Sequence, residues 1–358
     1  MQNNQAIPFN KENFKQIFSK EFLIVIIISI PAAILADYFN IPLAWFLGPM
    51  IITSILTLGG IKTKMPKLIL SSTLIILGLY IGNYIDENLF NQIHQWFWTS
   101  LIMLGYIIIS VLFVSKYLEK YSNYDKKTSI FSAAPGALGP LMILAEDEKS
   151  DLSRVATSHL IRLIIIITIF PFIVNSFYDA ENVKVAETII QDQNIIELFL
   201  LILVSIILIF IFDKLKIPAA LLAGTLVASG FLQITEVASY KLSPSIIDFS
   251  LLILGSSVGC RFADKTFPEI AKNALHSFVA TFILVLLGLI SAFIASLVID
   301  KNFYTLLLSY CPGGIYEVAV IAIFFDLDPE FVSFHHIIRL LLILFIVPII
   351  LRIIQKKT

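Results

Sequence analysis

The sequence predicts an all-α integral membrane protein built from two repeats, and three observations lead to that prediction. The chain has 358 residues, of which 58% are hydrophobic and 14% charged, whereas soluble domains are about half apolar and a quarter charged. The apolar residues gather in runs of about 20, which is the length that crosses a bilayer as a helix. Finally, the pattern of the first part returns in the second part at a nearly constant offset.

Twelve apolar elements lie between charges, prolines, glycines and asparagines. Six fall at about 21–39, 41–60, 66–85, 95–118, 128–145 and 152–176, and six at about 195–213, 217–233, 245–262, 272–299, 303–325 and 331–354. We expect the first to be a retained helix, because Ala32, Ala33 and Ala36 lack the spacing of a signal-peptide cleavage site.

Equivalent residues of the two parts keep one register over long stretches. The offset is 177 for the pairs Pro135 and Pro312, Gly136 and Gly313, His159 and His336, Arg162 and Arg339, Gly78 and Gly255, and Gly82 and Gly259. Two unrelated helix bundles would not align polar, kinking and small residues in this way. The sequence therefore predicts an internal duplication.

The charged connections decide the expected topology, because cytoplasmic loops carry an excess of Lys and Arg. If all twelve elements span, several basic connections of the second part fall outside the cell. If the elements at 128–145 and 303–325 enter the membrane and return on the same side, every basic connection falls inside the cell. The clearest exception to the rule is then the turn Glu146–Asp151, which is acidic and would also lie inside. Each repeat then has five spans plus one re-entrant or broken Pro-Gly element. An odd number inverts the second repeat, as in many secondary transporters.

This topology predicts five regions along the chain. They are a cytoplasmic N-terminal segment at 1–20, a first membrane repeat at 21–176, an external linker at 177–194, a second membrane repeat at 195–354 and a cytoplasmic tail at 355–358. The protein would cross its membrane several times.

The two Pro-Gly elements are the candidate substrate site. Proline removes a backbone donor and glycine loosens a helix, so Pro135-Gly136 and Pro312-Gly313-Gly314 free polar backbone groups inside the membrane. Such backbone is tolerated where it is buried in protein or lines a cavity, and a helix that restarts there favours an anion. The other interpretation is a pair of simple proline kinks.

Two His-Arg pairs add positive charge near these elements. His159 and Arg162, like His336 and Arg339, are three residues apart and so share a helix face. An arginine near the bilayer centre costs about 2.5–3.5 kcal/mol even on the low insertion scale, so each needs a partner or a ligand. The arginines would bind substrate, or they would cap loose carbonyl groups of the broken helices.

Glu317 is an acid in an apolar setting just after the second Pro-Gly-Gly, and its counterpart at the same offset is Pro140. The predicted site is therefore asymmetric. Glu317 would carry a proton, since burial raises the pKa of a carboxyl group, or it would form a salt bridge with Arg339.

Several classes of function lack support in the sequence. Cys260 and Cys311 form no Cys-x-x-Cys pair or Cys/His cluster, so we expect no metal and no cofactor. We find no phosphate-binding loop and no nucleophile elbow, so no catalytic residue is predicted. A basic stripe for nucleic acid is also missing. The Gly78/Gly82 and Gly255/Gly259 pairs are typical of close helix packing, and Trp96 and Trp98 are expected at the membrane interface.

These residues resemble the AbrB family of bacterial membrane proteins, a duplicated family often labelled ammonia monooxygenase. The resemblance covers both repeats and is carried by three segments and the Arg162 and Arg339 regions; the segments are Phe46-Leu47-Gly48-Pro49-Met50, Pro135-Gly136-Ala137-Leu138 and Pro312-Gly313-Gly314-Ile315-Tyr316-Glu317. The family pattern is similar to Pro-Gly-Gly followed by a Glu in each half. The first half departs from this pattern, because Ala137 replaces the second glycine and Pro140 replaces the acid. The resemblance implies an inner-membrane protein with a link to regulation of gene expression. No metal ligands support the monooxygenase label.

The resulting hypothesis is a secondary transporter for a small anionic or zwitterionic solute, with its site between the repeats. Its partners would be membrane lipid, the solute, a coupling H⁺ or Na⁺, and in one arrangement a second copy of the chain. The alternative is a membrane-bound regulator of gene expression that transports nothing.

Overall fold

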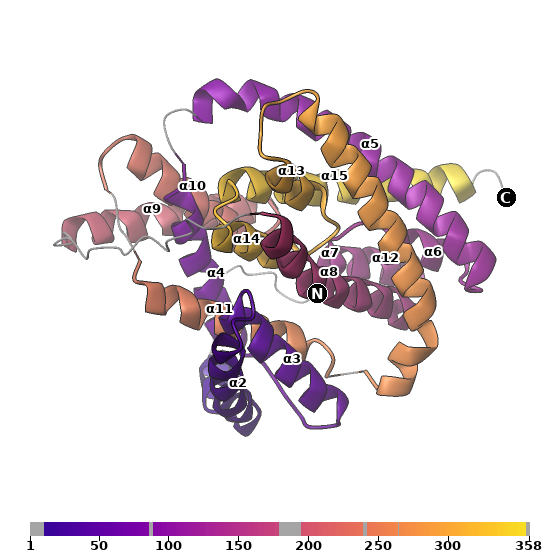
Figure 1. Cartoon of the computed structure of the whole chain (residues 1–358), viewed down its shortest axis with the longest axis horizontal. Helices are drawn as coiled ribbons and strands as arrows, with labels where there is room; N and C mark the ends of the chain where they lie inside the picture. The colour runs from indigo at the N-terminus through magenta and orange to yellow at the C-terminus, as the bar shows by residue number, and fades with distance from the viewer. Residues whose placement is uncertain (1–10, 86–88, 179–194, 239–241, 264, 356–358) are drawn as a thin grey trace. The chain divides into compact units, whose positions relative to one another are not determined.

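The computed structural model describes residues 11–85, 89–178, 195–238, 242–263 and 265–355, and all regular structure within these ranges is helical (Figure 1). Six helices are long and apolar enough to cross a membrane: α2 (Lys20–Tyr38), α5 (Leu89–Tyr121), α8 (Leu152–Phe177), α9 (Ile195–Lys214), α12 (Phe267–Ser296) and α15 (Pro329–Gln355). Shorter apolar helices are α3 (Ala44–Leu58), α4 (Lys67–Gly82), α10 (Ala220–Ile234), α11 (Pro244–Cys260) and α14 (Ile315–Phe324). The chain is thus a multi-pass helical membrane protein by length and composition.

The helices recur along the chain with almost the offset of the sequence pattern. In the first part, α6 (Lys126–Ala133) and α7 (Leu138–Asp147) are separated by a short break. Their counterparts are α13 (Phe303–Tyr310) and α14, which begin and end 177 residues later. The expected elements at 128–145 and 303–325 are therefore both broken helices.

Two expected elements, 41–60 and 217–233, begin later than the sequence suggested. Leu43 and Ala219 have left-handed backbone, with φ of 54° and 56°, and α3 and α10 start directly after them. A left-handed residue cannot continue a right-handed helix. Each Ile-Pro sequence therefore belongs to a turn and not to the helix.

The chain divides into two compact units, and each takes elements from both repeats. The first comprises Met1–Asn91, Asn175–Thr266 and Ile323–Glu330, and the second comprises Gln92–Val174, Phe267–Ala322 and Phe331–Thr358. The division cuts through both repeats, so that each unit combines helices of the first repeat with helices of the second. Residues 1–10, most of the expected linker (179–194) and the last three residues of the tail lie outside the described residues.

The first unit is held together by close contacts at the predicted small residues. A Cβ on Gly255 of α11 would meet the backbone of Phe46, and one on Gly259 would lie 2.7 Å from the Ser54 nitrogen of α3. Residue numbers rise together along this contact, so α3 and α11 run parallel. Gly78 and Gly82 of α4 meet α10 in the same manner, at Leu222, Thr225, Leu226 and Ser229. The expected packing role of these glycines is confirmed.

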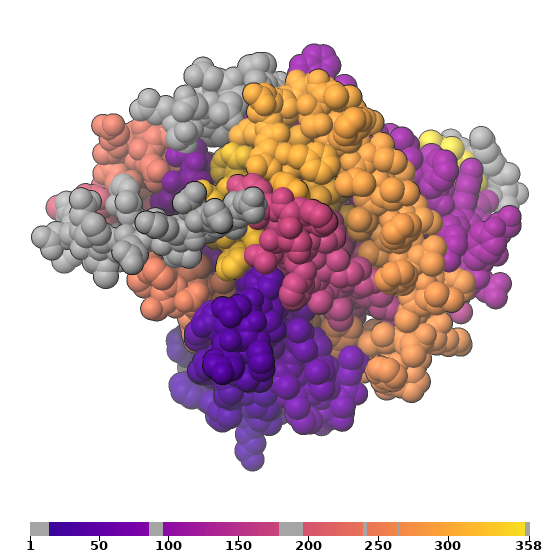
Figure 2. Space-filling view, viewed as in Figure 1, coloured from indigo at the N-terminus to yellow at the C-terminus, as the bar shows by residue number. Residues whose placement is uncertain are grey.

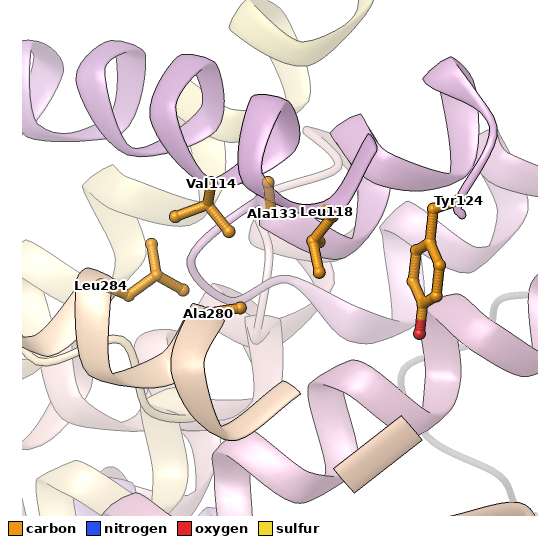
Figure 3. Close-up of a cluster of buried hydrophobic side chains, with 6 residues drawn as sticks. All are labelled: Val114, Leu118, Tyr124, Ala133, Ala280 and Leu284. Carbon is orange, nitrogen blue, oxygen red and sulfur yellow. The ribbon is translucent and has the colours of Figure 1, made fainter. Parts of the chain in front are cut away.

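The second unit contains the two broken helices and the long helices around them: α5, α8, α12 and α15. Figure 3 shows one of its apolar clusters, in which Val114 and Leu118 of α5 face Ala280 and Leu284 of α12, with Ala133 and Tyr124. Ala133 is the last residue of α6, so this cluster holds the first broken helix just before its break.

Large apolar side chains remain exposed on the long helices, as expected for a surface that faces lipid. The side chains of α12 lie at the surface along much of the helix (orange in Figure 2), and they include exposed Phe278, Phe282 and Phe293. Trp98 is exposed as expected for an interface residue, whereas Trp96 is 5% exposed and packs on Phe331 with the ring centroids 5.3 Å apart. Trp96 belongs to the core of the second unit.

Candidate functional site

Each broken helix folds as a hairpin in the second unit. In the first, Lys127 of α6 forms a 2.7 Å ion pair with Glu148, just beyond α7, and the Asp151 amide donates to the Thr128 hydroxyl over 3.0 Å. The start of α6 and the end of α7 therefore lie together, and the break lies at the hairpin tip. In the second, the Lys301 ammonium lies 5.5 Å from the ring of Phe331, near the start of α15.

Equivalent residues start both hairpins. Asp125 accepts hydrogen bonds from the amides of Lys127 and Thr128 at the start of α6. Asn302, 177 residues later, accepts one from the amide of Tyr304 at the start of α13. Both satisfy amide groups that a helix start leaves without an intrahelical partner, so the sequence fixes where each hairpin begins.

The backbone at the two tips differs. In the first hairpin, Gly136 and Ala137 have φ of 115° and 63°. The left-handed value favours glycine at 136 and is costly for a residue with a Cβ at 137. The second tip, with Gly313 and Gly314, does not use left-handed φ values. The tips are thus equivalent in sequence position and unequal in conformation.

Arg162 of α8 binds the end of α6. Its two terminal nitrogens donate to the carbonyl oxygens of Ser132 and Ala134 at 2.5 Å each. Carbonyl groups at a helix end have no intrahelical partner and carry partial negative charge. Arg162, which is 2% exposed, thereby compensates for the break.

Arg339 of α15 does the same for the second hairpin. It donates to the carbonyl oxygens of Cys311 and Gly313, and a further contact of 3.0 Å joins its Nη2 to Nδ1 of His336. The capping role that the sequence left as an alternative is therefore present at both arginines. In both residues the terminal nitrogens of the guanidinium group make the capping hydrogen bonds. The Nε atoms of Arg162 and Arg339 have no hydrogen-bond partner among the described residues.

The two predicted histidines bind the same helix ends one turn earlier. Nε2 of His159 lies 3.0 Å from the Phe131 carbonyl oxygen, and Nε2 of His336 lies 3.0 Å from that of Leu308. A carbonyl group only accepts, so Nε2 carries the proton in both rings. Since His336 also accepts from Arg339, its ring is neutral.

Glu317 lies at the start of α14 and is 1% exposed. Its carboxylate turns back toward Gly314, where an added Cβ would collide with Oε2. The salt bridge to Arg339 considered from the sequence is not formed, because Arg339 binds backbone carbonyl groups and His336. Instead, the carboxylate lies where the positive end of the α14 dipole favours an anion.

The structure joins the two predicted halves of the site. A Cβ on Gly136 would lie 3.0 Å from Nη2 of Arg339, so the second repeat's arginine reaches the first repeat's tip. A Cβ on Gly313 would in turn lie 3.2 Å from Ile166 of α8. Tyr106 of α5, which the sequence did not single out, is buried and close enough to both arginines to interact electrostatically. Nothing distinguishes it among the 12 tyrosines of the sequence.

The buried charges at these tips do not balance. Among the described residues, the arginine, lysine, aspartate and glutamate side chains in the buried class are Arg162, Arg339 and Glu317. Two guanidinium groups and one carboxyl group leave an excess of at least one positive charge. Neither arginine forms an ion pair with a described residue, so no side chain in the described part of the chain compensates the excess.

His335, next to the predicted His336, makes its contacts away from the hairpin tips. Its Nε2 lies 2.7 Å from the Thr99 hydroxyl and its Nδ1 lies 2.9 Å from the Phe331 carbonyl oxygen. The Tyr310 hydroxyl donates to the Thr99 carbonyl group over 2.7 Å. These contacts fix α5 against α13 and α15 and leave His335 outside the site.

No group of three His, Cys, Asp or Glu side chains that could hold a metal ion occurs in the part of the chain that the structure describes. A separate pocket of about 730 Å³ lies within the first unit. It is lined by the start of α2, the turn between α3 and α4 and the end of α11, including Ser19, Lys62, Lys64, Cys260 and Arg261.

These features define a helical, multi-pass membrane protein with a duplicated pattern and two paired hairpins. The family model described as "Transition state regulatory protein AbrB" matches residues 2–86 and 58–355, and the chain belongs to this AbrB family. The resemblance inferred from the Pro-Gly and arginine segments is thereby confirmed.

Two curated relatives agree with this assignment. "Putative regulator AbrB" of Escherichia coli (strain K12) is 22% identical over 317 residues, which cover 88% of this chain and 91% of that protein. "Uncharacterized protein YhjN" of Bacillus subtilis (strain 168) is 23% identical over 291 residues, covering 76% and 75%. No solved structure matches the chain.

Proposed function

We propose that this protein is a secondary transporter of a small anionic or zwitterionic solute in the bacterial inner membrane. The observation that carries the proposal is the pairing of two hairpin tips with two buried arginines and one buried glutamate. Interrupted helices that face each other in equivalent positions are the usual substrate site of repeat-built transporters. An excess positive charge in a place of low dielectric favours an anionic ligand.

The helix directions support inverted repeats. In the first repeat, α3 and α4 are joined by a short turn at 59–66, and helices joined in this way run antiparallel. By the 177-residue offset, α11 is the counterpart of α4, yet it runs parallel to α3 along the Gly255 and Gly259 contacts. A second repeat in the same orientation as the first would place α11 antiparallel to α3.

The pocket in the first unit supports the same topology. It brings together the start of α2, the turn between α3 and α4 and the end of α11. In a chain with five spans and one hairpin per repeat, all three lie on the side with basic loops. In a chain of twelve spans, the end of α11 would lie on the opposite side. The proposed orientation has both ends of the chain in the cytoplasm.

The alternative function is regulation of gene expression without transport. It is favoured by the names of the family model and of the E. coli relative. Apart from the stretch between Phe177 and Ile195, which the proposed topology places outside the cell, the connections between the described helices are short. They leave little surface for cytoplasmic machinery. The paired hairpin tips, whose buried arginines pair with no acidic side chain among the described residues, are accounted for by a solute site and have no evident use in such a regulator.

The proposal is tested with purified protein and a panel of small carboxylates, amino acids and matched neutral amides. Binding is measured as ligand-induced thermal stabilisation, followed by uptake into proteoliposomes for every ligand that binds. Arg339→Lys keeps the charge and loses the planar fork, so we expect binding at least about tenfold weaker, equivalent to about 1.4 kcal/mol. Arg352→Lys, an exposed position on the same helix, is the matched control and should bind as the wild type does.

Glu317→Gln separates coupling from binding in the same assay. If Glu317 carries the coupling proton, the variant should bind the solute but lose the pH dependence of uptake. If no member of the panel binds or is taken up, transport of small anions is excluded. If Arg339→Lys transports as the wild type does, the arginine is a structural cap and the site lies elsewhere.

A further inference from the structure

The helices that follow the two hairpin tips differ in their first turns. One of them has an acidic side chain there and the other does not. The second arm of each hairpin, α7 or α14, begins directly after the tip. A helix start presents amide groups and the positive end of the dipole, which together favour an anion. At α14 this place is filled by the chain itself, because the Glu317 carboxylate turns back toward Gly314.

The start of α7 has no such group. Its N-cap residue is Ala137, no side chain caps it, and no acidic residue lies in its first turn. The residue equivalent to Glu317 is Pro140, because 317 − 140 = 177. The amides of Leu138 and Gly139 therefore begin the helix without the internal carboxylate that serves α14.

A buried cation lies beside this empty place. A Cβ on Gly136, one residue before the N-cap, would lie 3.0 Å from Nη2 and 3.4 Å from Nε of Arg339. Arg339 is 2% exposed and its Nε has no hydrogen-bond partner among the described residues. A guanidinium group with a free donor, next to uncapped amides, matches the geometry that carboxylates need.

The first tip is also more open than the second. Gly139 is exposed and Gly136, Ala137 and Leu138 are partly exposed, whereas Pro312, Gly313, Ile315 and Glu317 are buried. A solute can reach the start of α7 more readily than the start of α14. The buried charges also favour an anion at the start of α7. Two arginines and one glutamate are buried among the described residues, and one bound anion would reduce the excess positive charge.

We infer that the start of α7 is a carboxylate subsite, in which the carboxylate of a monocarboxylate or an amino acid occupies the place that Glu317 fills at α14. Arg339 Nε and the amides of Leu138 and Gly139 would donate to it. The inference rests on the proposed function and narrows its substrate class to solutes with one free carboxylate and a net charge of zero or −1. The first repeat supplies the amides and the second repeat supplies the cation.

Pro140→Glu tests the subsite by restoring an internal carboxylate. Glu at this position lies where Glu317 lies in the second hairpin, so it should fill the subsite and exclude the ligand. Acetate, propionate and alanine serve as carboxylate probes and acetamide as the neutral control, with thermal stabilisation of the purified full chain as the readout. We expect the carboxylate probes to bind at least about tenfold more weakly to Pro140→Glu than to the wild type.

Pro140→Gln is the matched control, because it has nearly the shape of Glu without the charge. It should bind the probes within about threefold of the wild type. Both variants should elute as the wild type does in size-exclusion chromatography and keep its unfolding midpoint to within a few degrees, which verifies that loss of binding is not caused by misfolding.

The outcomes separate this inference from the proposed function. If the wild type binds the probes and Pro140→Glu binds them equally well, the subsite is wrong while an anion site elsewhere stands. If Pro140→Gln loses binding as completely as Pro140→Glu, the shape of the proline is responsible and the subsite is again wrong. If the wild type binds neither carboxylates nor alanine, the proposed function fails together with the subsite.

Discussion

Arg339 lies against Gly136, so that a methyl group on the glycine would come within 3.0 Å of the guanidinium Nη2. The two residues are far apart in the sequence and belong to different repeats. Gly136 lies in the break between α6 and α7, and Arg339 donates to the carbonyl groups at the break between α13 and α14. This contact brings the tip of the first hairpin against the arginine that caps the second. It also makes the backbone at 136 sensitive to any added side chain, because φ there is 115°.

Gly136→Ala should therefore destabilise the protein by about 1–3 kcal/mol, through a strained φ and the approach to Arg339. The measurement is the midpoint of unfolding of the purified protein in detergent. Gly139→Ala is the control, because Gly139 lies inside α7 and an added Cβ would find no atom within 4 Å. There the helix propensity of alanine predicts no loss, or a gain of up to about 1 kcal/mol. Equal effects at the two positions would contradict the strain argument.

Gly255→Ala should destabilise the first unit by about 1–3 kcal/mol, the usual range for overpacking. The added Cβ would collide with the backbone of Phe46, which cannot move like a side-chain end. Gly105→Ala in α5 is the control, since nothing lies within 4 Å of its position. Unfolding midpoints of the two variants test the difference, and a stable Gly255→Ala would mean that α3 and α11 pack differently.

The pKa of Asp125 predicts a dependence of stability on acidic pH. Partial burial raises this pKa, but hydrogen bonds from the Thr128 hydroxyl and from the amides of Thr128 and Lys127 outweigh that effect and hold the pKa below 3.8. Because the folded pKa lies below the unfolded one, the carboxylate stabilises the fold above about pH 4 and loses that contribution as the pH falls through the folded pKa.

Asp125→Asn should remove this dependence and keep the helix start, since Asn is an equally good N-cap and Asn302 occupies the equivalent place. Above about pH 5 the wild type should be more stable by about 0.5 kcal/mol. The difference should shrink toward pH 3. Unfolding midpoints of both proteins between pH 3 and pH 7 give the comparison, and a difference that grows toward low pH would have the wrong sign.

The proposed topology predicts opposite sides for Ser176 and Thr358. In a variant without Cys260 and Cys311, a cysteine at 176 should react with an impermeant reagent added outside intact cells, and one at 358 should react only after the cells are opened. An odd number of spans between the two positions gives this result. Reaction of both from outside would require an even number and would exclude the inverted arrangement of five spans and one hairpin per repeat.

The sequence by itself determined the helical membrane class, the duplication and the residues of the two tips. These depend on local properties: runs of apolar residues set the helices, Pro135 and Pro312 set the breaks, and one constant offset relates the repeats. The helices begin and end close to the predicted positions for the same reason. Several starts moved. After the left-handed turns at Leu43 and Ala219, which the hydrophobic pattern does not show, α3 and α10 begin later than expected. By contrast, α5 and α12 begin earlier, at Leu89 and Phe267, because their first turns contain polar residues.

Only the tertiary structure decided which groups meet. Arg162 and Arg339 could cap carbonyl groups or bind a ligand, and their terminal nitrogens are seen on backbone carbonyls while Nε remains without a partner. Glu317 could pair with Arg339, yet it turns to the start of its own helix. Each of these choices balances desolvation against contacts between distant segments. Such a balance depends on packing in three dimensions and leaves no periodic signal in the sequence.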